Sequence, residues 1–195
     1  MNKQFKKRLF PCILCAVLLC GCAGTDTGEA RKDSGEKETE KTAGAEENAP
    51  SSEIVFEGRD MEGNTVSSDI FSESRLTMVN VWATYCSPCL NEMPELGELA
   101  KEYESEDFQV IGIVSNVPED ADEEKLGLVE VLIGQTGADY PHLLLNQSLN
   151  DGLLADVTAV PTTFFFDREG KLLDTVVGAK EKSVWKEMID GFLEE

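Results

Sequence analysis

The residues best suited to chemistry are two cysteines, Cys86 and Cys89, which enclose the dipeptide Ser87-Pro88. They follow a short apolar run and open a stretch with helical periodicity. Unpaired backbone N–H groups and the dipole at a helix N-terminus favour an anion, so we expect a lowered pKa and a thiolate at Cys86. Pro88 suits the first helical turn, where no N–H is needed. Cys89 would lie one turn in, within disulfide reach, so the pair suits thiol–disulfide exchange.

Three other interpretations of this pair remain open. A static disulfide between Cys86 and Cys89 would close almost no loop and would therefore add little stability. A metal site would need further ligands, but the other four cysteines fall within the first 22 residues and the chain has one histidine, His142. Two inert core cysteines are the third alternative. Thiol–disulfide exchange accounts best for the position of the pair at a helix start.

The elements around the pair must position it, and residues 53–195 have the alternating pattern of one α/β domain. An apolar run at 77–82 predicts a buried strand just before Cys86, and apolar residues at three- and four-residue steps predict a helix over 88–103. Further strands are expected at 54–56, 65–66, 108–114, 142–145, 162–166 and 172–177, and further helices at 118–137, 149–155 and 184–192. This order predicts a mixed central sheet with helices on both faces and an N-terminal β-hairpin.

Residues 1–21 have the composition of an export signal. Basic residues at 3–8 precede an apolar run at 9–19 and a small-residue exit, an order typical of a secretory signal peptide. The run is shorter than the ~20 apolar residues that span a membrane, and an uncleaved anchor is the alternative. Cys12 and Cys15 share the spacing of the later pair, but they lie within the apolar run, where cysteine acts as a small hydrophobe.

The end of this segment, Leu19-Cys20-Gly21-Cys22, resembles the lipobox of bacterial lipoproteins, although that family prefers a small or β-branched residue where Cys20 stands. The resemblance implies cleavage before Cys22 and a diacylglyceryl group on its sulfur. Two acyl chains hold a protein stably at a membrane. Residues 22–52 have no aromatic residue and no apolar periodicity, so we expect a flexible linker between a lipid anchor, outside the cytoplasm, and the folded domain.

The formal net charge of −21 at pH 7 limits the partners of the chain. Phosphate backbones repel so acidic a protein, which excludes general nucleic-acid binding, and anionic lipid repels it unless a covalent anchor holds it there. A single histidine excludes a metal site that needs two or more imidazoles. We therefore expect neither a bound metal nor a cofactor.

The stretch from Val79 to Cys89, followed by Glu92-Met93-Pro94, resembles the active-site segment of the TlpA/ResA branch of thioredoxin-like proteins. Downstream, the run from Ala159 to Phe164 resembles the cis-proline loop of that family. The resemblance covers about residues 53–195, with both motifs in the expected order and context. It implies a thioredoxin-like fold with a redox-active disulfide between the two cysteines.

The resemblance also assigns roles to residues around the pair. It implies a cis peptide bond between Val160 and Pro161, packed against the cysteines, with the Val160 backbone pairing with an extended client segment. Tyr85 stands where the family usually has tryptophan, and its ring would form one wall of the substrate groove. Trp82 is expected in the core with one edge near the site, and Ser87-Pro88 influences the reduction potential.

A proton acceptor for Cys89 is the remaining requirement. Thioredoxin proper has a buried aspartate where this chain has Asn80, and an amide cannot take a proton at working pH. Glu92 lies three residues after Cys89 on the same helix face, and it matches a functional glutamate of ResA-type proteins. A partly buried carboxylate there would accept the proton of Cys89. The alternative is an ordinary solvated helix glutamate.

Together these features predict a lipid-anchored, extracytoplasmic oxidoreductase in which Cys86 attacks a client disulfide and Cys89 resolves the mixed disulfide. The resemblance suggests a membrane electron donor of the CcdA or DsbD type. It also suggests clients such as apocytochrome c, in cytochrome c maturation, or a methionine sulfoxide reductase. A disulfide-forming oxidase and a Sco-like copper or zinc chaperone stay open, although Sco relatives have a C-x-x-x-C pair and a later histidine ligand. His142 is expected at a strand edge without a role in the site.

Overall fold

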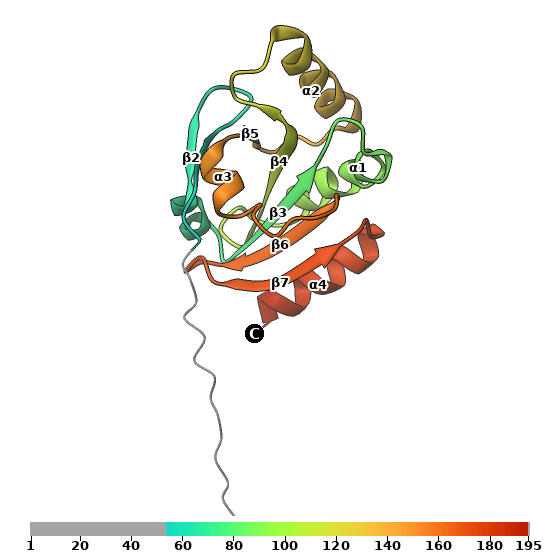
Figure 1. Cartoon of the computed structure of the whole chain (residues 1–195). Coiled ribbons are helices and arrows are strands. Elements are labelled where there is room, and N and C mark those ends of the chain that lie inside the picture. The colour runs from blue at the N-terminus through green and yellow to red at the C-terminus, as the bar shows by residue number, and fades with distance from the viewer. Residues whose placement is uncertain (1–53, 195) are drawn as a thin grey trace, which may run out of the picture. The chain divides into compact units, whose positions relative to one another are not determined.

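The computed structural model describes residues 54–194, in which five strands form one mixed sheet of order β5-β4-β3-β6-β7 (Figure 1). The strands are β3 (Leu76–Trp82), β4 (Phe108–Pro118), β5 (His142–Leu145), β6 (Thr162–Asp167) and β7 (Leu172–Val177). Strands β3, β4 and β5 are parallel, and β6 and β7 are antiparallel to their neighbours. Strand β3 lies at the centre with all of its residues buried, which explains its uninterrupted apolar character. The predicted mixed sheet is confirmed.

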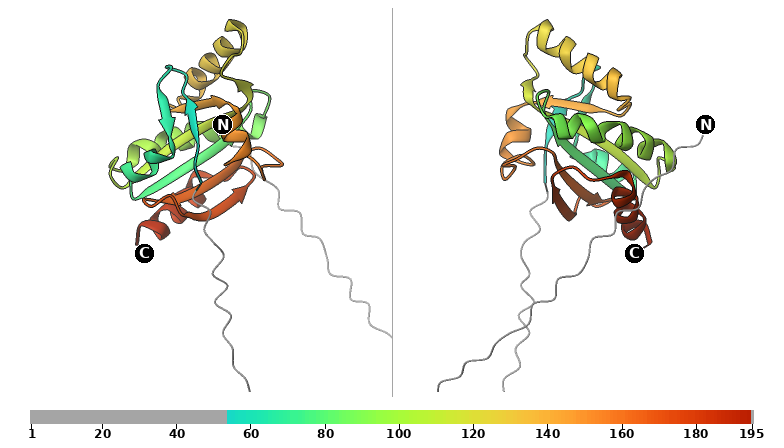
Figure 2. Two further views of the ribbon diagram at one scale, coloured as in Figure 1. Left: turned by 60° about the vertical axis from the view of Figure 1, so that its left-hand side comes forward. Right: turned by 90° about the vertical axis from the view of Figure 1, so that its right-hand side faces the viewer.

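Helices cover both faces of the sheet (Figures 1 and 2). On one face, α1 (Ser87–Glu102), α2 (Glu123–Thr136) and α4 (Lys182–Glu194) bury apolar side chains against the strands. On the other face, the 3-10 helix η1 (Ser68–Glu73) and α3 (Gln147–Asp151) enclose a second apolar core. Helix α1 follows β3 directly, so the loop between them places the cysteine pair at the carboxyl end of the central strand. None of the helices within residues 54–194 is both long and apolar enough to cross a membrane.

The N-terminal hairpin forms as predicted but with a shifted first strand. Strands β1 (Glu57–Arg59) and β2 (Thr65–Ser67) pair antiparallel in a sheet of their own, so the first strand begins at residue 57 rather than 54. The Asp60 carboxylate closes the turn because it accepts hydrogen bonds from the backbone N–H groups of Glu62 and Asn64. This turn fixes the register, and Asp60 also bridges to β5.

Helix α2 begins later than its predicted start at Pro118. That proline is the last residue of β4: it pairs with Leu145, and the next N–H, of Glu119, donates to the Leu145 carbonyl at 3.0 Å. The helix starts only after Asp122, whose side chain accepts a hydrogen bond from the Lys125 N–H at 2.9 Å. The prediction was wrong here because a proline suits a strand end as well as a first helical turn.

Helix α3 is shorter and earlier than the predicted segment 149–155. The side chain of Asn146 accepts a hydrogen bond from the Leu149 N–H at 2.9 Å and so sets the start of the helix. Gly152 ends it, and residues beyond it continue as turns.

Candidate active site

Cys86 and Cys89 are joined in a disulfide, with a Cα–Cα distance of 5.3 Å. Cys86 is the N-cap of α1, and its sulfur accepts a hydrogen bond from the Cys89 N–H at 3.3 Å. Ser87 and Pro88 occupy the exposed first turn between them. Cys86 is 6% exposed and Cys89 is fully buried. Cys86 is therefore the residue of the pair that retains an exposed fraction, and its sulfur lies where backbone N–H groups stabilise a thiolate.

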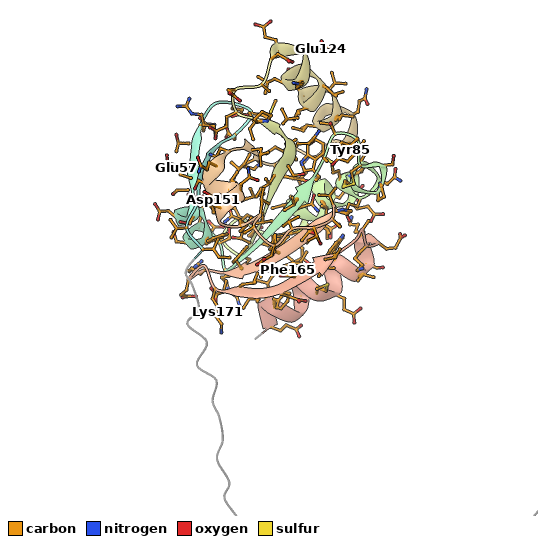
Figure 3. All side chains as sticks on the ribbon, viewed as in Figure 1. Glu57, Tyr85, Glu124, Asp151, Phe165 and Lys171 are labelled. Carbon is orange, nitrogen blue, oxygen red and sulfur yellow. A yellow bond between two sulfur atoms is a disulfide. The ribbon has the colours of Figure 1, made fainter. Side chains whose placement is uncertain are left out.

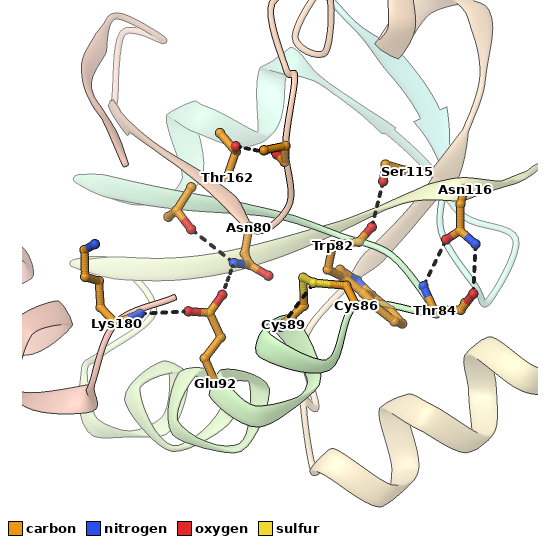
Figure 4. The surroundings of a disulfide bond; sticks show 12 residues. Asn80, Trp82, Thr84, Cys86, Cys89, Glu92, Ser115, Asn116, Thr162 and Lys180 are labelled. Carbon is orange, nitrogen blue, oxygen red and sulfur yellow. Dashed lines mark hydrogen bonds between the residues drawn. A yellow bond between two sulfur atoms is a disulfide. The ribbon is translucent and has the colours of Figure 1, made fainter. Parts of the chain in front are cut away.

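The loop from β3 to α1 is fastened to the end of β4 (Figure 4). The Thr84 N–H donates to the Asn116 side-chain oxygen at 3.0 Å, and the Asn116 side-chain N–H donates to the Thr84 hydroxyl at 2.8 Å. The Ser115 hydroxyl donates to the Trp82 carbonyl at 2.9 Å. Sequence reasoning missed Ser115 and Asn116. The available signal was their place at the carboxyl end of a strand parallel to β3, where polar side chains gather.

The cis-proline loop adjoins the cysteine pair. The peptide bond between Val160 and Pro161 is cis, as predicted. Val160 packs against the apolar cluster that contains both cysteines. The Pro161 carbonyl accepts a hydrogen bond from the Gly178 N–H at 2.8 Å, which ties the loop to the end of β7. Within the described residues, the N–H and C=O of Val160 form no hydrogen bond, so both remain open to an extended client segment.

A groove lies between Tyr85, which is labelled in Figure 3, and the cis-proline loop. Tyr85 is 75% exposed, which is unusual for so large a ring. The groove has a volume of about 240 Å³, and its lining joins residues from four segments: Tyr85, Ser115, Asn150, Leu154, Val157, Thr158, Ala159 and Val160. An exposed aromatic ring and a backbone with free hydrogen-bonding groups thus face the same space, as the binding of a protein segment requires.

Glu92 is a buried carboxylate, so the alternative of a solvated surface glutamate is wrong: the side chain is 3% exposed. Asn80 donates to one carboxylate oxygen at 3.0 Å, and the Lys180 backbone N–H donates to the other at 3.2 Å (Figure 4). The amide of Asn80 also donates to the Thr163 hydroxyl at 3.1 Å. Burial raises the pKa of Glu92, and the two hydrogen bonds oppose this rise without cancelling it. The Glu92 carboxylate therefore accepts a proton more readily than an exposed carboxylate does.

Trp82 and His142 meet behind the cysteines. Trp82 is fully buried in the cluster that contains both cysteines, as expected for a core residue beside the site. His142 does lie on the edge strand β5, but it is only 2% exposed, and its ring accepts a hydrogen bond from the Trp82 indole. Burial lowers its pKa to about 4. The expected place of His142 on an edge strand is confirmed, and the contact with Trp82 was not predicted.

Metal ligation finds little geometrical support among residues 54–194, where no group of three or more histidine, cysteine or acidic side chains could hold an ion. Both ring nitrogens of His142 are engaged, with Trp82 and with the Ala138 carbonyl. The predicted lipidation site Cys22, the signal peptide 1–21 and the linker 22–52 lie outside the described residues.

Comparisons with known proteins agree with this geometry. Residues 46–175 match the AhpC/TSA family. The thiol-disulfide oxidoreductase ResA of Geobacillus thermodenitrificans is 30% identical over 161 residues, which cover 78% of this chain and 80% of that protein. A thiol:disulfide interchange protein of Chlorobium tepidum is similar in structure, with a TM-score of 0.60, 25% identity and coverage of 74% of this chain and 97% of that one. The exposed lipoprotein thioredoxin Etrx1 of Streptococcus pneumoniae gives a TM-score of 0.54 at 28% identity, over 70% of this chain and 98% of that one.

Proposed function

Because the chain belongs to the AhpC/TSA family and is a thiol-disulfide oxidoreductase of the ResA type, we propose that it reduces disulfides of client proteins outside the cytoplasm, held at the cell membrane by a lipid on Cys22. The observation that carries this proposal is the asymmetry of the pair: Cys86 at the helix start retains a small exposed fraction, and Cys89 is fully buried. An outer attacking thiol and a shielded resolving thiol are the parts that exchange needs.

The reaction starts from the dithiol. The Cys86 thiolate attacks one sulfur of the client disulfide, and the other client sulfur leaves as a thiolate. Cys89 then gives its proton to Glu92 and attacks the Cys86 sulfur, and the first client sulfur leaves. Two electrons pass to the client, and the protein retains the Cys86–Cys89 disulfide. An electron donor of the CcdA or DsbD type would restore the dithiol.

The reductive direction is supported by the charge beside the pair. Stabilising a thiolate stabilises the reduced form and makes a pair more oxidising. Glu92 lies on the same face of α1 as Cys89 and is an acidic group, so it provides no positive charge to stabilise a thiolate there. The helix start stabilises a thiolate at Cys86, so it is the Cys89 side of the pair that favours a reductase over an oxidase: a thiol that is not stabilised as a thiolate gives up its electrons more readily.

Client binding is proposed in the groove beside Tyr85. An extended segment next to the client disulfide would pair with the open backbone groups of Val160 while its side chains contact the ring of Tyr85. Apocytochrome c and methionine sulfoxide reductase remain the clients that the family resemblance suggests.

Membrane attachment rests on the lipobox resemblance at Cys22. A flexible linker of residues 22–52 would reach ~30 Å on average, which lets the domain turn toward partners at the membrane. Intact-mass measurement of the membrane-extracted protein tests the anchor: a chain that begins at Cys22 with a diacylglyceryl adduct supports it, and a mature chain without lipid refutes it.

The direction is tested by the reduction potential, measured by equilibration with glutathione, together with Cys89→Ser to trap mixed disulfides. A low potential and trapped client proteins support the reductase, and Cys86→Ser/Cys89→Ser is the control that should trap none. A potential near that of strong oxidants would reverse the electron flow. Tight stoichiometric Cu(I) binding without disulfide turnover would instead favour the metal chaperone.

A further inference from the structure

The single histidine of the chain, His142, is held in one tautomer by its contacts with Trp82 and Ala138. The Trp82 indole N–H donates to His142 Nδ1 at 3.1 Å, and His142 Nε2 lies 3.0 Å from the Ala138 carbonyl. Because an indole can only donate, Nδ1 must accept. The ring proton is therefore on Nε2 and is donated to Ala138. The lowered pKa of His142 keeps the ring neutral near pH 7, so the Nδ1 lone pair is free for the indole.

The neighbouring strand β4 has a glycine opposite His142, which leaves room for the imidazole ring. Gly112 of β4 is the register partner of His142, and a Cβ atom at Gly112 would lie 2.1 Å from His142 Nδ1. No residue other than glycine fits there while the imidazole stays in place. On its other side the imidazole stacks on Tyr140, with ring centroids 4.5 Å apart and an angle of 30° between the planes. The imidazole is thus held from two sides in the position that meets the indole.

The indole that His142 holds is part of the surroundings of the disulfide. Trp82 shares one buried cluster with Cys86 and Cys89, and its ring lies beside the disulfide in Figure 4. The Trp82 side chain is fully buried, and a buried N–H usually has an acceptor. The neutral imidazole is its acceptor here, and a cysteine thiolate in the same cluster would be a second acceptor in the reduced protein.

We propose that His142 is a positioning residue of the redox centre: by accepting the Trp82 N–H it holds this donor away from the cysteine sulfurs and keeps the reduction potential of the pair low. This inference rests on the proposed reductase function. Reduction of the disulfide takes up two electrons and one proton and leaves a thiolate at Cys86 and a thiol at Cys89. Without His142, the unpaired indole N–H turns to that thiolate and stabilises the reduced form, so the pair becomes more oxidising.

The experiment compares His142→Leu with His142→Asn in the purified full-length chain. Leucine keeps the apolar volume but removes the acceptor, whereas asparagine retains an oxygen near the position of Nδ1. We expect His142→Leu to favour the dithiol about tenfold more in glutathione equilibration, a rise of about 30 mV for a two-electron couple. The thiolate absorbance should show a lowered Cys86 pKa. His142→Asn should remain near the wild type.

Two further variants test whether the effect passes through the indole. Gly112→Ala removes no polar group from the protein, but the added methyl group displaces the His142 imidazole. It should therefore raise the reduction potential as His142→Leu does. In a Trp82→Phe background, which lacks the donor, His142→Leu should cause no further change. Full additivity of Trp82→Phe and His142→Leu would refute the inference.

The remaining outcomes separate this inference from the proposed function. If His142→Leu unfolds at lower temperature but retains the wild-type potential and Cys86 pKa, His142 is a core residue only and the inference fails. If His142→Leu does not fold, His142→Asn and Gly112→Ala decide: an unchanged potential in Gly112→Ala refutes the inference. A wild-type protein with an oxidising potential overturns the reductase proposal itself, whatever the variants do.

Discussion

Acid should weaken the fold through His142. Burial lowers its pKa from 6.5 to about 4, because the protonated ring would lose solvation and its Nδ1 could no longer accept the Trp82 N–H. Between these values the unfolded chain binds more protons than the folded one, so stability falls as the pH falls. Linkage gives a loss of about 2 kcal/mol between pH 7 and pH 5, and of about 3 kcal/mol by pH 4.

The assay is denaturant unfolding at intervals from pH 7 to pH 5, which stays above the isoelectric point of about 4.3, where an uncharged protein precipitates. Glu92 titrates with the opposite sign: its pKa is raised above 4.5, so the folded state gains stability as the carboxyl group takes up its proton. His142→Leu retains Glu92 and lacks the imidazole, so the difference between the two proteins isolates His142. Parallel stability curves for wild type and His142→Leu would refute the reasoning.

Three further predictions concern the surroundings of the pair. Glu92→Gln should slow resolution on the order of 100-fold and flatten the pH–rate profile, because an amide cannot accept the Cys89 proton; an unchanged profile would contradict the role. Asn116→Ala removes two hydrogen bonds to Thr84 and should cost about 1–3 kcal/mol in denaturant unfolding. Gly97→Ala should cost about 1–3 kcal/mol, because its Cβ would lie only 2.4 Å from the Gly137 carbonyl; a neutral effect would mean that α1 and α2 can separate there.

The sequence-based predictions succeeded where local pattern decides the structure. The apolar run of β3 and the three- and four-residue steps of α1 each set one element, and together they place Cys86 at a helix start. Pro118 misled the prediction of α2 because one residue type suits two positions, and only the bond from Glu119 to the Leu145 carbonyl distinguishes them. That bond joins distant segments, so no local window contains it.

The site residues that the sequence did not reveal depend on strand register. Asn80 of β3 is the partner of Gly112 on one side and of Thr163 on the other, and Gly112 is in turn the partner of His142. These four residues come from four strands that are separated in the sequence. Periodicity marks each strand but not its register with the next one. His142 can be buried because its register partner, Gly112, has no side chain. The two residues are far apart in the sequence, so no local pattern links them.

This row of paired residues also places two different groups behind the cysteines. On one side Asn80 holds Glu92, an acidic group that offers no positive charge to a thiolate. On the other side His142 takes up the Trp82 N–H, a donor that would otherwise stabilise a thiolate. Glutamine, like glutamate, offers no positive charge, so Glu92→Gln should leave the reduction potential near the wild type, whereas His142→Leu should raise it and the double variant should match His142→Leu. A double variant that differs from His142→Leu would show that both residues act through one shared contact.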